Sequence, residues 1–158
     1  MTEPTRNSGE APPASAQVRS VLIVAPEESL LSLPLARPIK WPYFESSIDA
    51  QAVIGKLGSF TPNIDTTLTQ ITNLSTHNAA IWRCSRGLIN HLAMIDVLST
   101  ASFLNDWNLR TGFIDFANPQ AALGDLIFQM KQLAALALRH DEQLYIESRD
   151  PPPGGWKV

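Results

Sequence analysis

The sequence predicts an all-α protein with a four-helix core and extended, partly disordered N- and C-terminal arms. From Ser46 to His140, apolar residues recur at intervals of three and four, the period of a helix buried on one side. Both ends are rich in residues that do not fold: the first 17 residues in Pro, Ser, Ala and Glu, and the tail in Pro and Gly. The expected parts are a disordered arm (1–17), an extended apolar arm (18–45), a helical core domain (46–146) and a flexible tail (147–158).

The extended arm begins with the β-branched run VRSVLIVA, residues 18–25, which is long enough for one strand but has no obvious partner in the chain. Four prolines then space out a connector that has few ways to fold on itself. Such a segment must lie across something, either its own helices or a neighbouring subunit. As a subunit-linking arm it would bury the apolar residues Leu30, Leu33, Leu35, Trp41 and Phe44.

Three helices are predicted over 47–58, 62–82 and 88–105. Ser47 can cap the first, and a glycine stands where that helix should end. The second has Thr, Ser and Asn rather than charged residues on its outer faces. Leu98 continues the apolar stripe of the third.

The last predicted helix has the clearest boundary in the chain. Asn118 is a good N-cap, and Pro119 fits the first helical position, where its missing N–H costs nothing. Its buried stripe runs from Leu123 to Leu138. Acidic residues come early and basic residues late, which suits the helix dipole.

The amino-acid composition limits the classes of function that we expect for this chain. Only 17% of the residues are charged, against a usual value of about 25%, so the chain has little charge to keep neighbouring molecules apart and self-association is expected. The net charge of −3 and the lack of a Lys/Arg run argue against a free-standing nucleic-acid binder. A polymer whose subunits each contribute one or two arginines stays possible. With no apolar leader and no run of about 18 apolar residues, the expected location is cytoplasmic, without a membrane partner.

No chemical motif predicts an enzyme. His77, Cys84 and His91 are spaced by seven residues, but seven residues of helix span about 10 Å. One helix face therefore cannot bring them to the same metal ion. Cys84 stands between Arg83 and Arg86 without a phosphate-binding loop after it. We therefore expect no catalytic residues, no metal and no cofactor.

The stretch NLRTGFIDFANPQAAL, residues 108–123, carries a resemblance through Asn108-Leu109-Arg110, Asp115-Phe116 and Pro119, with Gln129-Met130-Lys131 and Ala134-Ala135-Leu136 beyond it. These elements resemble the core of flexuous filamentous plant-virus coat proteins. The resemblance implies an all-helical core, an RNA groove supported by Arg110 and Asp115, and arms that lock subunits together. Phe113-Ile114-Asp115-Phe116 stands here in place of that family's contiguous Phe-Asp-Phe.

Two further resemblances lead to the same kind of function. The stretch is similar to the capsid part of retrotransposon Gag proteins, and the size and four-helix layout are similar to rod-shaped virus coat proteins. The residues shared with Gag are Trp107, Phe113, Phe116, Pro119 and Lys131-Gln132.

The leading hypothesis is a self-assembling coat or capsid-type protein, found in the virion, which polymerises with itself and encloses single-stranded RNA. Arg83, Arg86 and Arg110 are its expected RNA-binding residues, and Arg110 with Asp115 is an expected ion pair at the turn into the last helix. The alternative is a cytoplasmic adaptor or effector that binds another protein through an amphipathic helix face.

Overall fold

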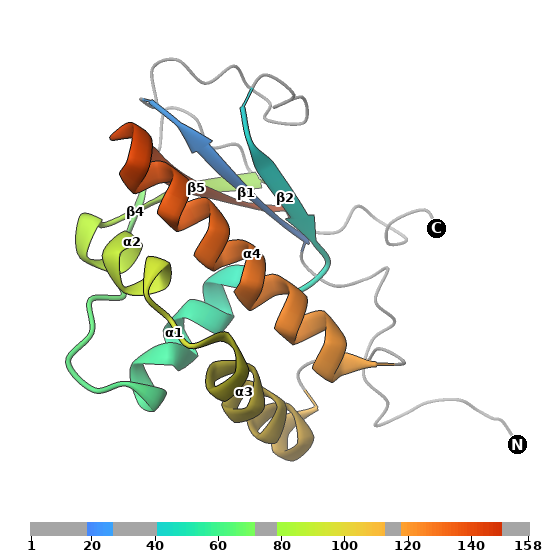
Figure 1. Cartoon of the computed structure of the whole chain (residues 1–158). Coiled ribbons are helices and arrows are strands. Elements are labelled where there is room, and N and C mark those ends of the chain that lie inside the picture. The colour runs from blue at the N-terminus through green and yellow to red at the C-terminus, as the bar shows by residue number, and fades with distance from the viewer. Residues whose placement is uncertain (1–18, 27–40, 72–78, 113–117, 150–158) are drawn as a thin grey trace, which may run out of the picture.

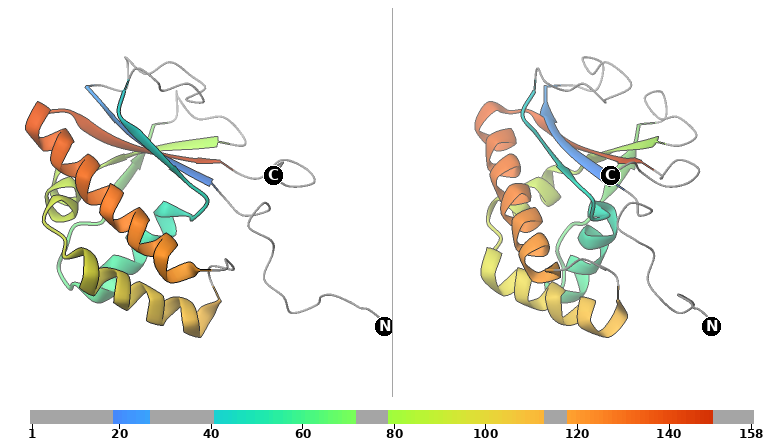
Figure 2. Two further views of the ribbon diagram at one scale, coloured as in Figure 1. Left: turned by 45° about the vertical axis from the view of Figure 1, so that its right-hand side comes forward. Right: turned by 90° about the vertical axis from the view of Figure 1, so that its right-hand side faces the viewer.

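A computed structural model describes residues 19–26, 41–71, 79–112 and 118–149. It contains a five-stranded antiparallel sheet with four helices gathered on one of its faces (Figures 1 and 2). The prediction of an all-α fold is therefore wrong. The strands are β1 (Arg19–Ala25), β2 (Tyr43–Ser46), β3 (Leu68–Gln70), β4 (Ala79–Cys84) and β5 (Gln143–Arg149), and they lie in the order β2-β1-β5-β4-β3.

The strand predicted from VRSVLIVA is confirmed as β1, and it has partners in its own chain. It pairs with β2, where Leu22 lies opposite Phe44, and with β5, where Leu22 lies opposite Ile146. The β5 partner lies far along the sequence. The residues close to β1 in the sequence therefore give no indication of its pairing with β5.

The segment predicted as a helix over 62–82 contains β3 and the first four residues of β4. Its apolar residues have helical spacing, but threonine and isoleucine are frequent in it, and β-branched residues favour strands. Leu68 and Cys84 face each other across β3 and β4, and Gln70 faces Trp82. Tertiary pairing therefore overrides the helical spacing.

The four helices are α1 (Ala50–Phe60), α2 (Arg86–Ala93), α3 (Val97–Thr111) and α4 (Pro119–His140). The first begins later than predicted, because Asp49 rather than Ser47 caps it, accepting from the N–H groups of Gln51 and Ala52. The predicted helix over 88–105 is really two helices, α2 and α3, which are bent by 105°. The predicted start of α4 is confirmed, since the Asn118 side chain accepts from the Ala121 N–H at 3.1 Å.

The main core lies between the sheet and the helices. It contains residues from β1, β4, β5 and all four helices, and α4 contributes more of them than any other element. Ser20 on β1 ties the sheet to α1, because its hydroxyl accepts from the Ala50 N–H at 2.9 Å. In Figures 1 and 2, α3 is the helix that lies farthest from the sheet.

A second apolar cluster lies on the other face of the sheet, with Trp41 packed against it. Tyr145 belongs to this cluster, and Glu147, two residues further along β5, is buried as well. One Glu147 oxygen accepts from Nε and Nη2 of Arg149, at 2.9 and 2.7 Å. This ion pair satisfies a carboxylate that is only 1% exposed. The cluster consists of Val21, Ile23, Ala25, Ile71, Ile81 and Tyr145.

Within the described residues, α4 is the one helix that is by itself long and apolar enough to cross a membrane, while α2 and α3 pass the same test only as a bent pair. One side of α4, from Leu123 to Ala137, is buried in the main core. That packing accounts for its apolar composition.

Candidate protein-interaction surface

The helix α3 is held firmly at both ends by its own sequence. Asp96 caps its start, accepting from the N–H groups of Leu98 and Ser99 at 3.1 and 3.3 Å. Gly112 ends it in the left-handed conformation, with φ 66°, and donates its N–H to the Asn108 carbonyl oxygen at 2.8 Å. Both ends of α3 are thus fixed by capping.

One side of α3 is fixed to its neighbours. The Phe103 ring stacks on Phe60 of α1, with ring centroids 4.6 Å apart, and the Lys56 ammonium lies 5.8 Å from the centroid of the Trp107 ring. Just before α3, the Ile95 carbonyl oxygen accepts from Lys131 Nζ of α4 at 2.8 Å. The buried residues of α3 are Thr100, Ala101, Leu104 and Asn108.

The other side of α3 exposes large apolar side chains. Leu98 and Leu109 are 84% and 74% exposed, and Met94, in the turn between α2 and α3, is 82% exposed. Leu98, Ser102, Asn105 and Leu109 follow one another at intervals of four, three and four residues, so they lie along one line of the helix. We call this line the α3 stripe.

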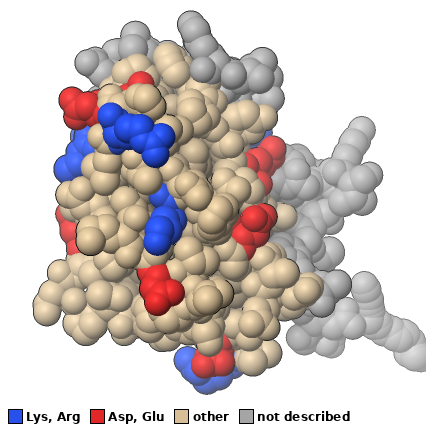
Figure 3. Space-filling view, in the orientation of Figure 1, with Lys and Arg blue, Asp and Glu red and all other residues tan. Residues whose placement is uncertain are grey.

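The surroundings of the α3 stripe carry few charges. Figure 3 shows a face with broad uncharged areas, and at its lower end a basic and an acidic side chain lie together. The helix α3 itself exposes Asp106 and Arg110. Further large apolar side chains are exposed elsewhere, on α4 and at the start of β2. Those residues are Phe128, Leu138 and Tyr43.

Leu98 is a correction to the predicted buried stripe of the helix over 88–105. Because Asp96 starts a new helix, the phase of the apolar pattern changes between Ile95, which is buried, and Leu98. The cap could have been recognised from the sequence, since aspartate is one of the residues most favoured at a helix N-cap. The bend between α2 and α3, which turns Leu98 outward, could not be recognised from the sequence.

The three arginines expected to bind RNA lie on three separate parts of the fold. Arg83 is half-buried on β4, between Thr69 and Tyr145 of the neighbouring strands, on the sheet face opposite the helices. Arg110 is exposed in the last turn of α3.

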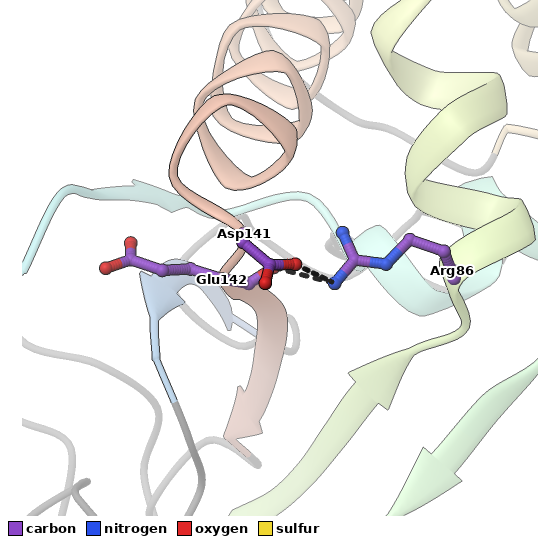
Figure 4. Close-up of polar contacts among 3 residues, drawn as sticks. All are labelled: Arg86, Asp141 and Glu142. Atoms are coloured by element: carbon purple, nitrogen blue, oxygen red, sulfur yellow. Dashed lines mark hydrogen bonds and ion pairs between the residues drawn. The ribbon is translucent and has the colours of Figure 1, made fainter.

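Arg86 begins α2 and points to the turn between α4 and β5 (Figure 4). Its Nη2 donates to the Glu142 carbonyl oxygen at 3.3 Å and lies 3.8 Å from Asp141 Oδ1. Because Asp141 is fully exposed, this ion pair is well screened by water. In this position Arg86 ties α2 to the turn, and it lies on a different element from Arg83 and Arg110.

Other predicted site residues fall partly outside the described ranges. Asp115, and with it the Arg110–Asp115 pair, lies there, as do Leu30, Leu33 and Leu35 of the proposed subunit-linking arm. The two described members of that arm contact their own chain. Trp41 packs against the second cluster, and Phe44 packs against the main core.

The Cys84 thiol is buried in the main core. The residue stands at the end of β4, and burial raises the pKa of its thiol to about 12, so the thiol stays protonated at neutral pH. His91 is half-buried in α2, while His77 lies outside the described residues. Across 19–26, 41–71, 79–112 and 118–149, no three His, Cys, Asp or Glu residues lie close enough to hold a metal ion.

Asp65 forms a polar cluster that the sequence did not predict. Its carboxylate accepts from the Thr67 N–H and from the hydroxyl of Ser85, both at 2.8 Å. Hydrogen bonds from the side chain and the N–H of Thr67, and then from Ser85, hold the pKa of Asp65 below its usual value. Ser85 also accepts from the Leu88 N–H and so caps α2. The cluster fixes the loop before β3 to the start of α2, a structural role.

Leu98, Met94 and Leu109, on and just before α3, are thus the three most exposed large apolar side chains among the described residues. A comparison of the chain with protein-family models, with curated proteins and with solved structures finds no match.

Proposed function

We propose that this chain is a non-catalytic, self-associating protein that binds a second copy of itself through the outer side of α3. One observation supports it most directly: Leu98 and Leu109 are 84% and 74% exposed on a helix whose other side is fixed by packing. Fully burying a leucine side chain contributes about 1.5–3 kcal/mol. Two leucines from each of two copies contribute roughly 6–12 kcal/mol, which is comparable with the roughly 4–15 kcal/mol that association costs, so the leucines alone give a weak contact.

A second copy is proposed as the partner because the exposed charges of α3, which are Asp96, Asp106 and Arg110, are of both signs and would not strongly repel the same face of another copy. A surface that repels its own copies has a strong net charge, and this protein has a formal net charge of only −3 spread over 158 residues. The pKa of about 12 that burial gives the Cys84 thiol argues against a cysteine nucleophile at this position, and Cys84 is the single cysteine of the chain.

A coat or capsid-type assembly around RNA is the most specific form of this function. It has two further requirements. One is a second contact surface, since a symmetric contact alone closes at a dimer. The other is an arrangement in which arginines from successive subunits follow one strand, because Arg83, Arg86 and Arg110 lie apart in a single chain. Self-association is the requirement that the described residues support.

The test is the molar mass of the purified full chain by light scattering, over a range of protein concentrations and at low and moderate salt. We expect a mass that rises with concentration. Leu98→Gln with Leu109→Gln should abolish the rise, because glutamine keeps the helix but removes the apolar contact. Leu138→Gln, at the far end of α4, is the matched control and should leave the rise unchanged.

Three outcomes separate the possibilities. A rise that the double variant abolishes supports the proposal, and a further rise with single-stranded RNA supports the coat-type form. A rise that the double variant leaves intact moves the contact to another surface. A monomer at every concentration overturns self-association and favours the adaptor hypothesis, in which a different protein binds the same face.

A further inference from the structure

The strand β5 lies between two strands that pair with it but not with each other. It pairs with β1 over Arg19–Ala25 and with β4 over residues 79–83, and in the described sheet β1 and β4 are joined only through β5. Without β5, the sheet would separate into β2-β1 and β4-β3, each with an open edge. We call the place between β1 and β4 the β5 slot. Both strands that form it come before β5 in the chain.

The buried charge of β5 has its partner on the same strand. Glu147 is 1% exposed, and its carboxylate accepts from Arg149, two residues further along β5. The other fully buried residues of β5 belong to the two apolar clusters of the sheet. A β5 that enters the slot of another chain therefore brings its own ion pair with it, and no unpaired charge is left buried in either chain.

The connection between α4 and β5 is short and can act as a hinge. It consists of Asp141 and Glu142, and Asp141 has φ 53° and ψ 47°, a left-handed conformation that aspartate adopts less readily than glycine. The Glu142 N–H donates to the Ala137 carbonyl oxygen at 2.8 Å. On the other side of the turn, Arg86 makes its two long contacts at exposed atoms, where water can replace them (Figure 4). Short connections with a strained backbone favour the exchange of a terminal element between copies.

We propose that β5 is exchangeable, so that two copies of the chain form a dimer in which each β5 fills the β5 slot of the other. Such a dimer keeps every strand pair of the single chain, and only the turn at residues 141–142 changes its conformation. The occupant follows from the slot itself, which in the single chain already holds this strand in register on both sides.

This inference goes beyond the contact proposed for α3 and does not depend on it. The β5 slot is in the sheet, whereas α3 is the helix that lies farthest from the sheet (Figures 1 and 2). A chain that used both contacts could extend beyond a dimer, because two different symmetric contacts on one chain do not close on each other. Exchange of β5 would thus supply the second contact that a coat-type assembly requires.

A cysteine on each side of the β4–β5 pair detects the exchange. Ala80 lies opposite Ser148, and Cα atoms of opposed residues in antiparallel strands are roughly 4.5–5.5 Å apart, within reach of a disulfide. Two variants of the full chain are made, Ala80→Cys and Ser148→Cys. Each is unfolded in urea, refolded with a reductant, alone or as an equal mixture, and then oxidised. The wild-type chain is the control, because its single cysteine, Cys84, is buried.

We expect a covalent dimer from the mixture, in a yield that rises with the protein concentration during refolding, and none from either variant alone. The reason is that only an exchanged β5 brings Ser148→Cys of one chain beside Ala80→Cys of another. A mixture that gives no covalent dimer at any concentration would overturn the inference. Equal yields from the mixture and from the single variants would also overturn it, because they would show chance contact between thiols.

The hinge provides a second measurement in the same assay, with Asp141 changed in both chains. Asp141→Gly should lower the yield about two- to five-fold, because glycine adopts the left-handed conformation of the closed turn more readily. Asp141→Pro should raise it, because proline cannot reach φ 53° and lacks the N–H that donates to the Leu138 carbonyl oxygen. A higher yield with Asp141→Gly would contradict the inference, and so would an Asp141→Pro chain that folds as a monomer. If Asp141→Pro does not fold, Asp141→Gly decides alone.

Repeating the mixture with Leu98→Gln and Leu109→Gln in both chains separates the two proposals. We expect an unchanged yield of covalent dimer, because these leucines lie on α3 and not in the sheet. A yield that the leucine changes abolish would mean that the cross-link depends on contact through α3, and the exchange of β5 would be refuted. An exchanged dimer separates only when β5 leaves its slot, so its mass should not fall on dilution. A mass that falls on dilution reports the α3 contact instead, whatever the cross-linking shows.

Discussion

The buried ion pair on β5 allows a quantitative prediction about stability. Glu147 is 1% exposed, and both hydrogen bonds from Arg149, at 2.7 and 2.9 Å, go to one of its oxygens. Arg149→Met keeps most of the side-chain volume but leaves the carboxylate buried without its cation. We expect this single change to be among the most destabilising available in the sheet.

The magnitude follows from the burial of the two groups. Removing one member of a buried ion pair typically costs about 3–5 kcal/mol. Arg149 is 20% exposed, so some water already reaches the guanidinium, and the lower end, about 3 kcal/mol, applies here. A chain of 158 residues has a free energy of unfolding of roughly 8–15 kcal/mol. The variant should therefore fold, but with a clearly reduced stability.

Urea unfolding followed by circular dichroism measures the effect. With an m value of about 1.5–2 kcal/mol per molar, a loss of 3 kcal/mol lowers the midpoint by about 1.5–2 M. Glu147→Leu combined with Arg149→Met should recover most of the loss, because an apolar pair of similar volume is often as stable as a buried ion pair. Arg86→Met is the control, since its ion pair with Asp141 is exposed, and it should leave the midpoint nearly unchanged.

The reasoning fails if Arg149→Met lowers the midpoint no more than Arg86→Met does. It also fails if the double variant on β5 is less stable than Arg149→Met alone. Either result would mean that the Glu147 carboxylate has another source of stabilisation besides Arg149.

Three other predictions concern α4, α2 and the strand before α2. Gly124→Ala in α4 should raise stability by about 0.5–1 kcal/mol, because nothing lies within 4 Å of the added Cβ. Gly87→Ala in α2 should instead lower the urea midpoint, because its Cβ would lie 2.7 Å from Asp65 Oδ2 and 3.0 Å from Asp65 Cβ. Cys84 should react with a thiol reagent more than about a hundred-fold more slowly in the folded chain than in urea, since the thiol is buried and its pKa is about 12; a fast reaction at pH 8 would contradict this.

Local signals were sufficient where both partners of an interaction lie within a few residues. The start of α4 was predicted correctly because Asn118 needs only the N–H of Ala121 to cap the helix. The strand β1 was recognised for a similar reason, as a compact β-branched run. Both features depend almost entirely on residues that lie close to them in the sequence.

Pairing over long distances could not be predicted in the same way. In β5, Leu144, Tyr145 and Ile146 are all buried because the strand has a core on each face, so the alternation that marks a strand is missing. The segment that forms β3 and β4 has apolar residues at helical spacing, and only its partners make it a sheet. The same limit applies to the α3 stripe, since the outward position of Leu98 depends on how α2 and α3 meet.

The position of β5 in the sheet has a consequence for biosynthesis. Although β5 follows all the other strands and helices that the structure describes, it lies at the centre of the sheet, between β1 and β4. While the ribosome is still making α4, β2-β1 and β4-β3 can exist only as two separate hairpins, each with an edge open to other chains. The protein can close its sheet only after residue 149 has left the ribosomal exit tunnel. Until then, β1 and β4 are the edges most in need of protection by a chaperone.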